Sequence, residues 1–134
     1  MIRLLSVDDH PIVRDGIVRL IATQPDMKLI AEASDGQEAV EQFRKHQPDV
    51  TLMDLQMPNM NGLEAATAIR KLEQESDLHT PILALTAHAM EGDRERCIDA
   101  GMDDYLSKPI HAKDLLAKIN TLISLGGSRE RADA

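Results

Sequence analysis

Cysteine and aromatic residues are scarce in this sequence of 134 residues. The single cysteine, Cys97, cannot form a disulfide within the chain, which favours a reducing compartment. There is no tryptophan, and Phe43 and Tyr105 are the only aromatic residues. Hydrophobic residues still make up 43% of the chain, enough for the core of one compact domain. We therefore expect a core of Leu, Ile, Val, Ala and Met.

Long apolar runs and positive charge are also lacking. No apolar stretch approaches the roughly 20 residues of a membrane-spanning helix, and the N-terminal segment turns acidic at Asp8 too early for a signal peptide. The net charge is −8, whereas nucleic-acid binding requires a basic surface that neutralises phosphates. The composition thus predicts a cytoplasmic protein that contacts neither a membrane nor nucleic acid directly.

Short apolar runs alternate with longer segments of helical periodicity five times along the chain. The predicted strands are Ile2–Val7, Met27–Ala33, Val50–Met53, Ile82–Leu85 and Asp104–Ser107. Five strand–helix units in a row predict a parallel sheet with helices on both faces. We expect residues 1–125 to form this domain. Residues 126–134, two glycines followed by charged residues, are expected to form a flexible tail or linker.

Polar residues end four of the five predicted strands: Asp8-Asp9, Asp54, Thr86 and Lys108. Because ligands bind at the carboxyl ends of the strands in an open parallel sheet, these side chains are expected to converge. A single Asp after a strand is a helix cap or a turn residue about as often as it is a functional residue. Three neighbouring carboxylates, however, repel one another unless a cation or a shifted pKa relieves the repulsion.

The chemistry of these groups favours phosphoryl transfer. Mg²⁺ prefers oxygen ligands, commonly one or two carboxylates and a phosphate, and a carboxylate can itself be the nucleophile. We predict that Asp8 and Asp9 hold Mg²⁺ and that Asp54 both contacts the metal and attacks phosphorus. Lys108 would pair with one phosphoryl oxygen as a point charge, and Thr86 would donate a hydrogen bond to another.

Five separated motifs in this sequence resemble the signature of the response-regulator receiver family: Asp8-Asp9, Leu52–Pro58, Gly62, Thr86-Ala87 and Lys108-Pro109. The resemblance extends over about residues 2–124. It implies a flavodoxin-like (βα)5 doubly wound sheet with strand order 2-1-3-4-5. It also implies a cis Lys108–Pro109 peptide, which the small trans preference before proline permits.

The resemblance further implies a two-component phosphorelay receiver rather than an enzyme acting on other substrates. Asp54 would accept a phosphoryl group from a phosphohistidine donor, so the domain would catalyse only its own phosphorylation and dephosphorylation. Asp9 would bind Mg²⁺ directly, Asp8 partly through water, and the backbone carbonyl of Gln56 would complete the protein's share of the metal shell.

Partners and switching are implied in the same way. The helix over residues 11–22 would dock a histidine kinase or histidine phosphotransfer domain. The last two helices and the last strand would contact an output partner or a second copy of the chain. Phosphorylation would draw Thr86 toward the phosphoryl group and let Tyr105 turn inward. Alternatively, Tyr105 is a half-buried strand residue without this role.

Three nearby residues carry weaker hypotheses. Gln56 and His88 follow Asp54 and Thr86 by two positions, so they would set the dephosphorylation rate by ordering or blocking the attacking water. They are equally well interpreted as solvated loop residues. His10 is interpreted as a loop or cap residue rather than a ligand, because Mg²⁺ prefers oxygen.

The two halves of the chain resemble different branches of the family. Residues 8–16 are similar to receivers of helix-turn-helix transcription regulators, whereas residues 80–109 are similar to receivers of hybrid histidine kinases. This contrast suggests a chimera with a junction within residues 65–80. A natural sequence that blends both styles is the alternative.

Three other functions are less consistent with the residues. A Mg²⁺-dependent phosphatase or phosphotransferase with an aspartate nucleophile typically carries a second acid two residues later, where this chain has Gln56. A flavin- or nucleotide-binding module would need a glycine- or hydroxyl-rich loop after the first strand. A phosphorylation-independent interaction domain would not require the complete set of acids.

Overall fold

The computed structural model describes residues 1–55, 57, 59–74, 79–86 and 93–133, with the backbone alone at 93–94 and 125–133. The strands are β1 (Ile2–Val7), β2 (Met27–Ala33), β3 (Val50–Asp54), β4 (Ile82–Thr86) and β5 (Asp104–Ser107). They form one parallel sheet in the order β2-β1-β3-β4-β5. The predicted flavodoxin-like topology is therefore confirmed.

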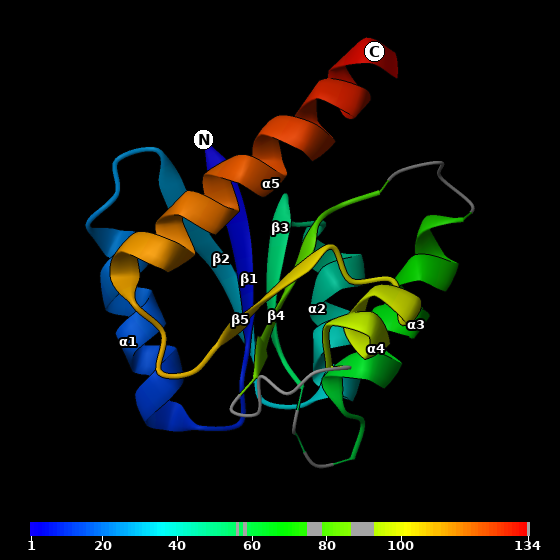
Figure 1. The fold of residues 1–134 in the computed structure, drawn as a ribbon, viewed down its shortest axis with the longest axis horizontal. Coiled ribbons are helices and arrows are strands. Elements are labelled where there is room, and N and C mark those ends of the chain that lie inside the picture. The colour runs from blue at the N-terminus through cyan, green and yellow to red at the C-terminus, as the bar shows by residue number, and fades with distance from the viewer. Residues whose placement is uncertain (56, 58, 75–78, 87–92, 134) are drawn as a thin grey trace.

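Helices cover both faces of this sheet (Figure 1). The helices are α1 (Pro11–Ala22), α2 (Gly36–His46), α3 (Gly62–Glu73), α4 (Asp93–Asp99) and α5 (Ala112–Asp133). Helices α1 and α5 lie on one face, and α2, α3 and α4 lie on the other. This arrangement follows from the crossover that each parallel strand pair requires.

The core consists of two apolar layers separated by the sheet. Adjacent strand residues point to opposite faces, so Leu4 packs toward α1 and α5 whereas Leu5 packs toward α2 and α3. Both layers consist mainly of aliphatic side chains, as the composition predicts. Phe43 is buried in the second layer, and Tyr105 packs against that layer while remaining half-buried.

The last helix extends past residue 125. The sequence predicts a flexible tail or linker over residues 126–134, and the backbone of α5 runs through Gly126 and Gly127 to Asp133. Each glycine costs a helix about 1 kcal/mol, and the helix-forming residues that follow, such as Arg129 and Glu130, offset part of this cost. Among the described residues, no helix combines the length and apolar character needed to cross a membrane.

Candidate functional site

The polar residues predicted at the strand ends lie along one edge of the sheet, at the bottom of Figure 1. Asp8 follows β1, Asp54 is the last residue of β3, and Thr86 is the last residue of β4. All three are buried, with at most 2% of their surface exposed. Burying polar side chains in this way is unfavourable unless partners or a ligand compensate for the lost hydration.

Lys108 joins two of these strands electrostatically. Its Nζ lies 3.1 Å from Asp8 Oδ2 and 3.4 Å from Asp54 Oδ1. The residue follows β5, and its backbone N–H donates to the carbonyl of Thr86 at 2.7 Å. The Lys108–Pro109 peptide is cis, as the family resemblance implies. One ammonium group is thus placed between the acids of β1 and β3.

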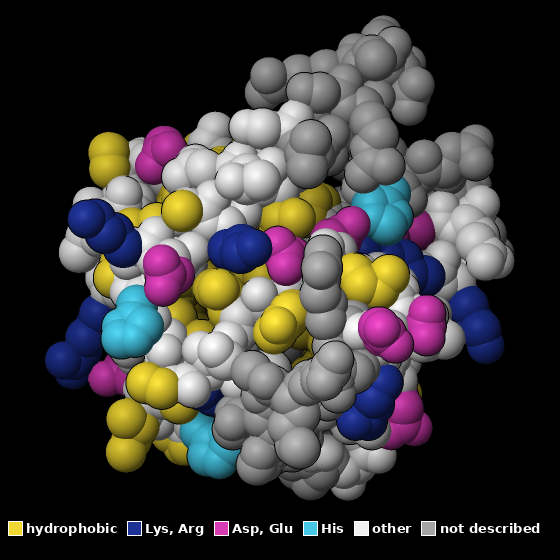
Figure 2. Space-filling model, in the orientation of Figure 1, with side chains coloured by type: hydrophobic (Ala, Val, Ile, Leu, Met, Phe, Trp, Pro, Cys, Tyr) yellow, Lys and Arg dark blue, Asp and Glu magenta, His cyan; other side chains and the backbone are white. Residues whose placement is uncertain are grey.

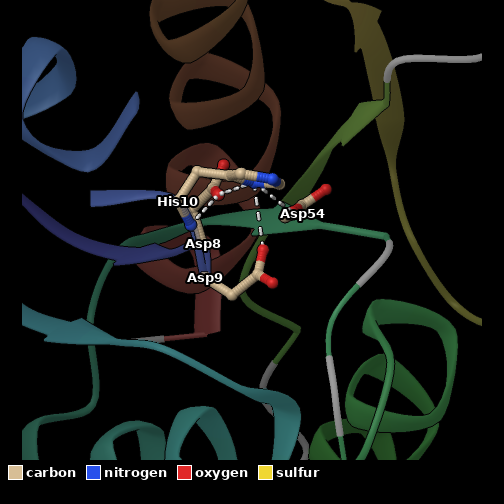
Figure 3. Close-up of side chains that lie close together, drawn as sticks. All are labelled: Asp8, Asp9, His10 and Asp54. Atoms are coloured by element: carbon tan, nitrogen blue, oxygen red, sulfur yellow. Dashed lines mark hydrogen bonds and ion pairs between the residues drawn. The ribbon is translucent and has the colours of Figure 1, made fainter. Parts of the chain in front are cut away.

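His10 lies closer to the acids than the sequence indicated. It occupies the N-cap position of α1, as expected, but its side chain makes no capping hydrogen bond. Its Nδ1 lies 3.1 Å from Asp8 Oδ1, 3.0 Å from Asp9 Oδ1 and 3.9 Å from Asp54 Oδ2 (Figure 3). Sequence reasoning missed this contact because a histidine after an acidic pair is not a recognisable pattern. The side chain is 62% exposed, so it covers the cluster from the solvent side.

The acids outnumber the cations in this cluster. Asp8, Asp9 and Asp54 carry three negative charges against the one positive charge of Lys108, and one potential ligand atom from each acid and from His10 lies within 4.8 Å of the others. Asp9 Oδ1 is buried without a hydrogen bond among the described residues, although the His10 ring lies beside it. Excess carboxylate oxygens and a buried acceptor lacking a hydrogen bond fit a hard divalent cation such as Mg²⁺.

The beginning of α3 lies close to the end of β3. The N–H of Gly62 donates to the carbonyl of Leu55 at 3.1 Å. A Cβ at Gly62 would lie only 2.3 Å from the Asp54 carbonyl oxygen, so only glycine permits this approach. A capping box between Asn61 and Glu64 then begins α3. These local interactions fix both ends of the segment between β3 and α3. This segment contains Gln56, whose backbone carbonyl is the remaining predicted Mg²⁺ ligand.

Two predicted site residues, Gln56 and His88, lie outside the described residues. Tyr105 and Thr86 lie on neighbouring strands, where Ala84 pairs with Tyr105 and Thr86 with Ser107. The side chains brought together among the described residues are therefore those of Asp8, Asp9, Asp54 and Lys108, with Thr86 at the same edge and His10 as an addition.

An apolar groove opens beside the cluster. It has a volume of about 340 Å³ and lies between α1 and the segment joining β5 to α5. Ile12, Val13 and Gly16 of α1 line it on one side, and Lys108, Pro109 and Ile110 line it on the other. Figure 2 shows apolar side chains on the surface at lower left, over α1. The sequence did not predict that Pro109 and Ile110 line this groove, because the segment between β5 and α5 has no periodic pattern.

Solved structures with this fold define the class of protein. The response regulator domain of Thermotoga maritima CheB matches with a TM-score of 0.83 and 35% identity, covering 92% of this chain and 97% of that one. A response regulator of the LuxR family from Aurantimonas sp. SI85-9A1 also matches with a TM-score of 0.83, at 32% identity. It covers 98% of this chain and 99% of that chain.

The family model for the response regulator receiver domain matches residues 4–120. The chain belongs to this family, whose members are the receivers of two-component signalling. Among curated relatives, response regulator protein VraR of Staphylococcus aureus is 40% identical over 115 residues, 85% of this chain and 53% of VraR. Hybrid signal transduction histidine kinase I of Dictyostelium discoideum is 46% identical over 99 residues, 70% of this chain but 6% of the kinase.

These two relatives represent both styles that the sequence suggests, a response regulator and a hybrid kinase. Each match is long enough to extend across residues 65–80, where the junction of a chimera is predicted. Neither relative therefore matches one half alone, and the chimera stays a prediction. The chain spans about half the length of VraR and a small part of the kinase.

Proposed function

We propose that Asp54 accepts a phosphoryl group from a phosphohistidine donor in a Mg²⁺-dependent reaction. The observation that carries this proposal is the imbalance of charge at the carboxyl edge. Three carboxylates lie close together at the ends of two strands, and one lysine ammonium contacts two of them, at 3.1 and 3.4 Å. A cluster with this excess of negative charge is stabilised by a cation, and the cation in turn allows a phosphoryl group to approach.

The side chains of the cluster would divide the work of phosphoryl transfer. Asp8, Asp9 and Asp54 would hold Mg²⁺ together with the backbone carbonyl of Gln56, and the bound ion would neutralise charge on the phosphoryl oxygens. An Asp54 carboxylate oxygen would form the bond to phosphorus as the bond to the donor nitrogen breaks. The electron pair would remain on the imidazole, which then takes up a proton. The Lys108 ammonium already lies within 3.4 Å of Asp54. It would exchange a carboxylate contact for an ion pair with a phosphoryl oxygen.

We propose that the donor docks over α1. The groove beside Lys108 is apolar, and Ile12 at its margin is 88% exposed. An exposed apolar side chain next to the acids would be covered by the apolar face of a histidine kinase or histidine phosphotransfer domain. This position would bring the phosphohistidine to Asp54 across the rim formed by Lys108.

Phosphorylation is proposed to change the face formed by α4, β5 and α5. Thr86 at the end of β4 would donate a hydrogen bond to a phosphoryl oxygen, and the half-buried Tyr105 on the adjacent strand would turn inward. The altered face would contact an output partner or a second copy of the chain. Gln56 and His88 would adjust the dephosphorylation rate. Wild-type phosphate lifetimes in both Gln56→Ala and His88→Ala would end that part of the proposal.

The direct test is incubation with Mg²⁺ and acetyl phosphate, followed by intact-mass measurement beside Asp54→Asn. We expect a single phosphoryl adduct that hydroxylamine removes and that is absent without Mg²⁺ and in Asp54→Asn. The adduct is an acyl phosphate, which accounts for its sensitivity to hydroxylamine. If no adduct forms under conditions where Mg²⁺ binding is verified, the domain is an interaction module that works without phosphorylation.

A further inference from the structure

The segment after the phosphoacceptor is fastened to the beginning of α2. The N–H of Gly36, the first residue of α2, donates to the carbonyl of Met60 at 2.8 Å. A Cβ at Gly36 would lie 2.3 Å from the same oxygen, so the two backbones approach as closely as glycine allows. The loop between β3 and α3 is thereby in backbone contact with a different strand–helix unit.

One carboxylate holds both sides of this contact. Asp35 Oδ1 accepts from the backbone N–H of Glu38 at 2.8 Å and so caps α2. Asp35 Oδ2 accepts from the side-chain amide of Asn59 at 3.0 Å. Asn59 has a φ of 67°, a left-handed conformation that few residues other than glycine, asparagine and aspartate adopt readily. The loop thus has a left-handed residue that asparagine accommodates, and its side chain is held by the N-cap residue of α2.

The two hydrogen bonds also keep Asp35 charged. The backbone N–H of Glu38, followed by the amide of Asn59, lowers the pKa of Asp35 below its ordinary value. The carboxylate of Asp35 is therefore ionised at neutral pH. An ionised acceptor forms stronger hydrogen bonds than a neutral one, so ionisation strengthens the bonds that Asp35 accepts from Glu38 and Asn59.

We infer that Asp35 and Asn59 are positioning residues for the Mg²⁺ and phosphoacceptor site. Neither residue belongs to the cluster of Asp8, Asp9, His10 and Asp54. They act through the backbone, because the Asp35–Asn59 bond and the Gly36–Met60 bond fix the far end of the loop that begins at Asp54. This inference rests on the proposed function, since it concerns the loop that supplies the predicted carbonyl ligand.

Asn59→Asp is the most informative variant. Aspartate tolerates a positive φ and has the shape of asparagine, but it places a second carboxylate against that of Asp35. The added negative charge would by itself favour a nearby Mg²⁺ ion, so weaker binding must come from the lost anchor. We expect the Mg²⁺ dissociation constant, measured by calorimetry without a phosphodonor, to rise about 10-fold, the scale of outer-shell effects on metal affinity.

The swapped pair provides the matched control. In the double variant Asp35→Asn with Asn59→Asp, the amide and the carboxylate exchange places, so the hydrogen bond can form again. Asparagine caps a helix about as well as aspartate, and α2 keeps its N-cap. We expect Mg²⁺ affinity to return to within about threefold of the wild type, which a general loss of stability would not produce.

Asn59→Gly keeps the test decisive if Asn59→Asp fails to fold. Glycine adopts the positive φ without strain and removes only the amide, so we expect a smaller loss of Mg²⁺ affinity in the same direction. Wild-type affinity in folded Asn59→Asp and Asn59→Gly would overturn the inference, as would equal weakness of Asn59→Asp and the swapped pair. If the wild type itself binds no Mg²⁺, the proposed function fails first and the inference with it.

Discussion

Two clusters of charged side chains lie at opposite edges of the sheet and make a useful comparison. At the carboxyl edge, Asp8, Asp9 and Asp54 share one lysine. At the amino edge, Arg70 of α3 contacts Glu73 on its own helix and Asp103 just before β5, the latter at 2.8 Å. Both clusters combine aspartate or glutamate with a single long cationic side chain.

The amino-edge cluster is satisfied within the chain. Arg70 also donates to the carbonyls of Gly101 at 2.7 Å and Thr80 at 2.8 Å. All four carboxylate oxygens have partners there. Those of Glu73 bond Arg70 and both the N–H and hydroxyl of Thr80, and those of Asp103 bond Arg70, His79 and the N–H of Ile82. This network joins α3, β4 and the segment after α4.

Unlike the amino-edge cluster, the carboxyl-edge cluster, within the described part of the chain, lacks a hydrogen bond for one buried carboxylate oxygen and lacks positive charge to balance its acids. Its negative charges exceed its positive charge by two when His10 is neutral, and Asp9 Oδ1 is buried without a hydrogen bond among the described residues. A buried polar network in which every group is paired stabilises a fold, whereas one with excess charge indicates a site that needs a ligand. Polar composition alone does not separate the two cases, because both edges have it.

The largest expected effect follows from breaking the amino-edge cluster. Arg70→Met should lower the free energy of unfolding by about 3–5 kcal/mol, because it leaves the buried carboxylate of Glu73 and the half-buried carboxylate of Asp103 without their cation. Urea unfolding monitored by circular dichroism measures this. The neighbouring exposed Lys71 is the control, and Lys71→Met should change stability by no more than about 0.5 kcal/mol. Equal losses of unfolding free energy in both variants would mean that the Arg70 network does not stabilise the fold more than an exposed lysine does.

The second prediction concerns the response of the carboxyl edge to metal. Mg²⁺ at 100 times its dissociation constant should raise the free energy of unfolding by about 2.7 kcal/mol, since the folded state alone presents the three acids together. Urea unfolding with MgCl₂, compared with KCl of the same ionic strength, measures the effect.

Asp9→Asn is the control for the metal response. It should abolish most of the Mg²⁺ stabilisation while leaving stability in a chelator unchanged or about 1 kcal/mol higher, because it removes one of three repelling charges. A variant that loses stability without metal would show that Asp9 supports the fold, and the contrast between the two edges would be weakened.

The smallest expected effect lies in the groove beside the acids. Nothing lies within 4 Å of a Cβ built at Gly16 in the middle of α1, so no contact within the chain requires glycine there. Gly16→Ala should therefore stabilise the protein by about 0.5–1 kcal/mol. Under the proposed docking of the donor over α1, it should also slow transfer from a phosphohistidine donor while leaving acetyl phosphate labelling unchanged. A destabilised variant, or equal rates with both donors, would contradict this use of the groove.

Prediction from sequence was most successful for the strands and for the residues that follow them. The alternation of short apolar runs with helical periodicity placed all five strands within one residue of their observed ends. The carboxyl ends of parallel strands meet at one edge, so the same pattern predicted that the acids, Thr86 and Lys108 would lie along that edge. The strand order and the cis peptide came from the family resemblance instead.

The sequence was less informative where contacts join distant segments. The ring of His10 among the acids, the bond between Asp35 and Asn59, and the Arg70 network were not predicted. Each depends on side-chain direction and on loops that approach from different units of the fold. The helical backbone of residues 126–133 was not predicted either, because a pair of glycines was given more weight than the helix formers after it.

The sequence by itself determined the class of fold, the aliphatic core and the set of residues at the carboxyl edge, because these follow from local periodicity and from the geometry of parallel strands. Only the tertiary structure decided which charged cluster, among the residues it describes, has a hydrogen bond for each carboxylate oxygen and which leaves a buried oxygen without one. That distinction depends on the hydrogen-bond partners that each carboxylate oxygen finds at sequence separations of 21 to 100 residues. Such partners have no periodic pattern, so they become visible only when the chain is folded.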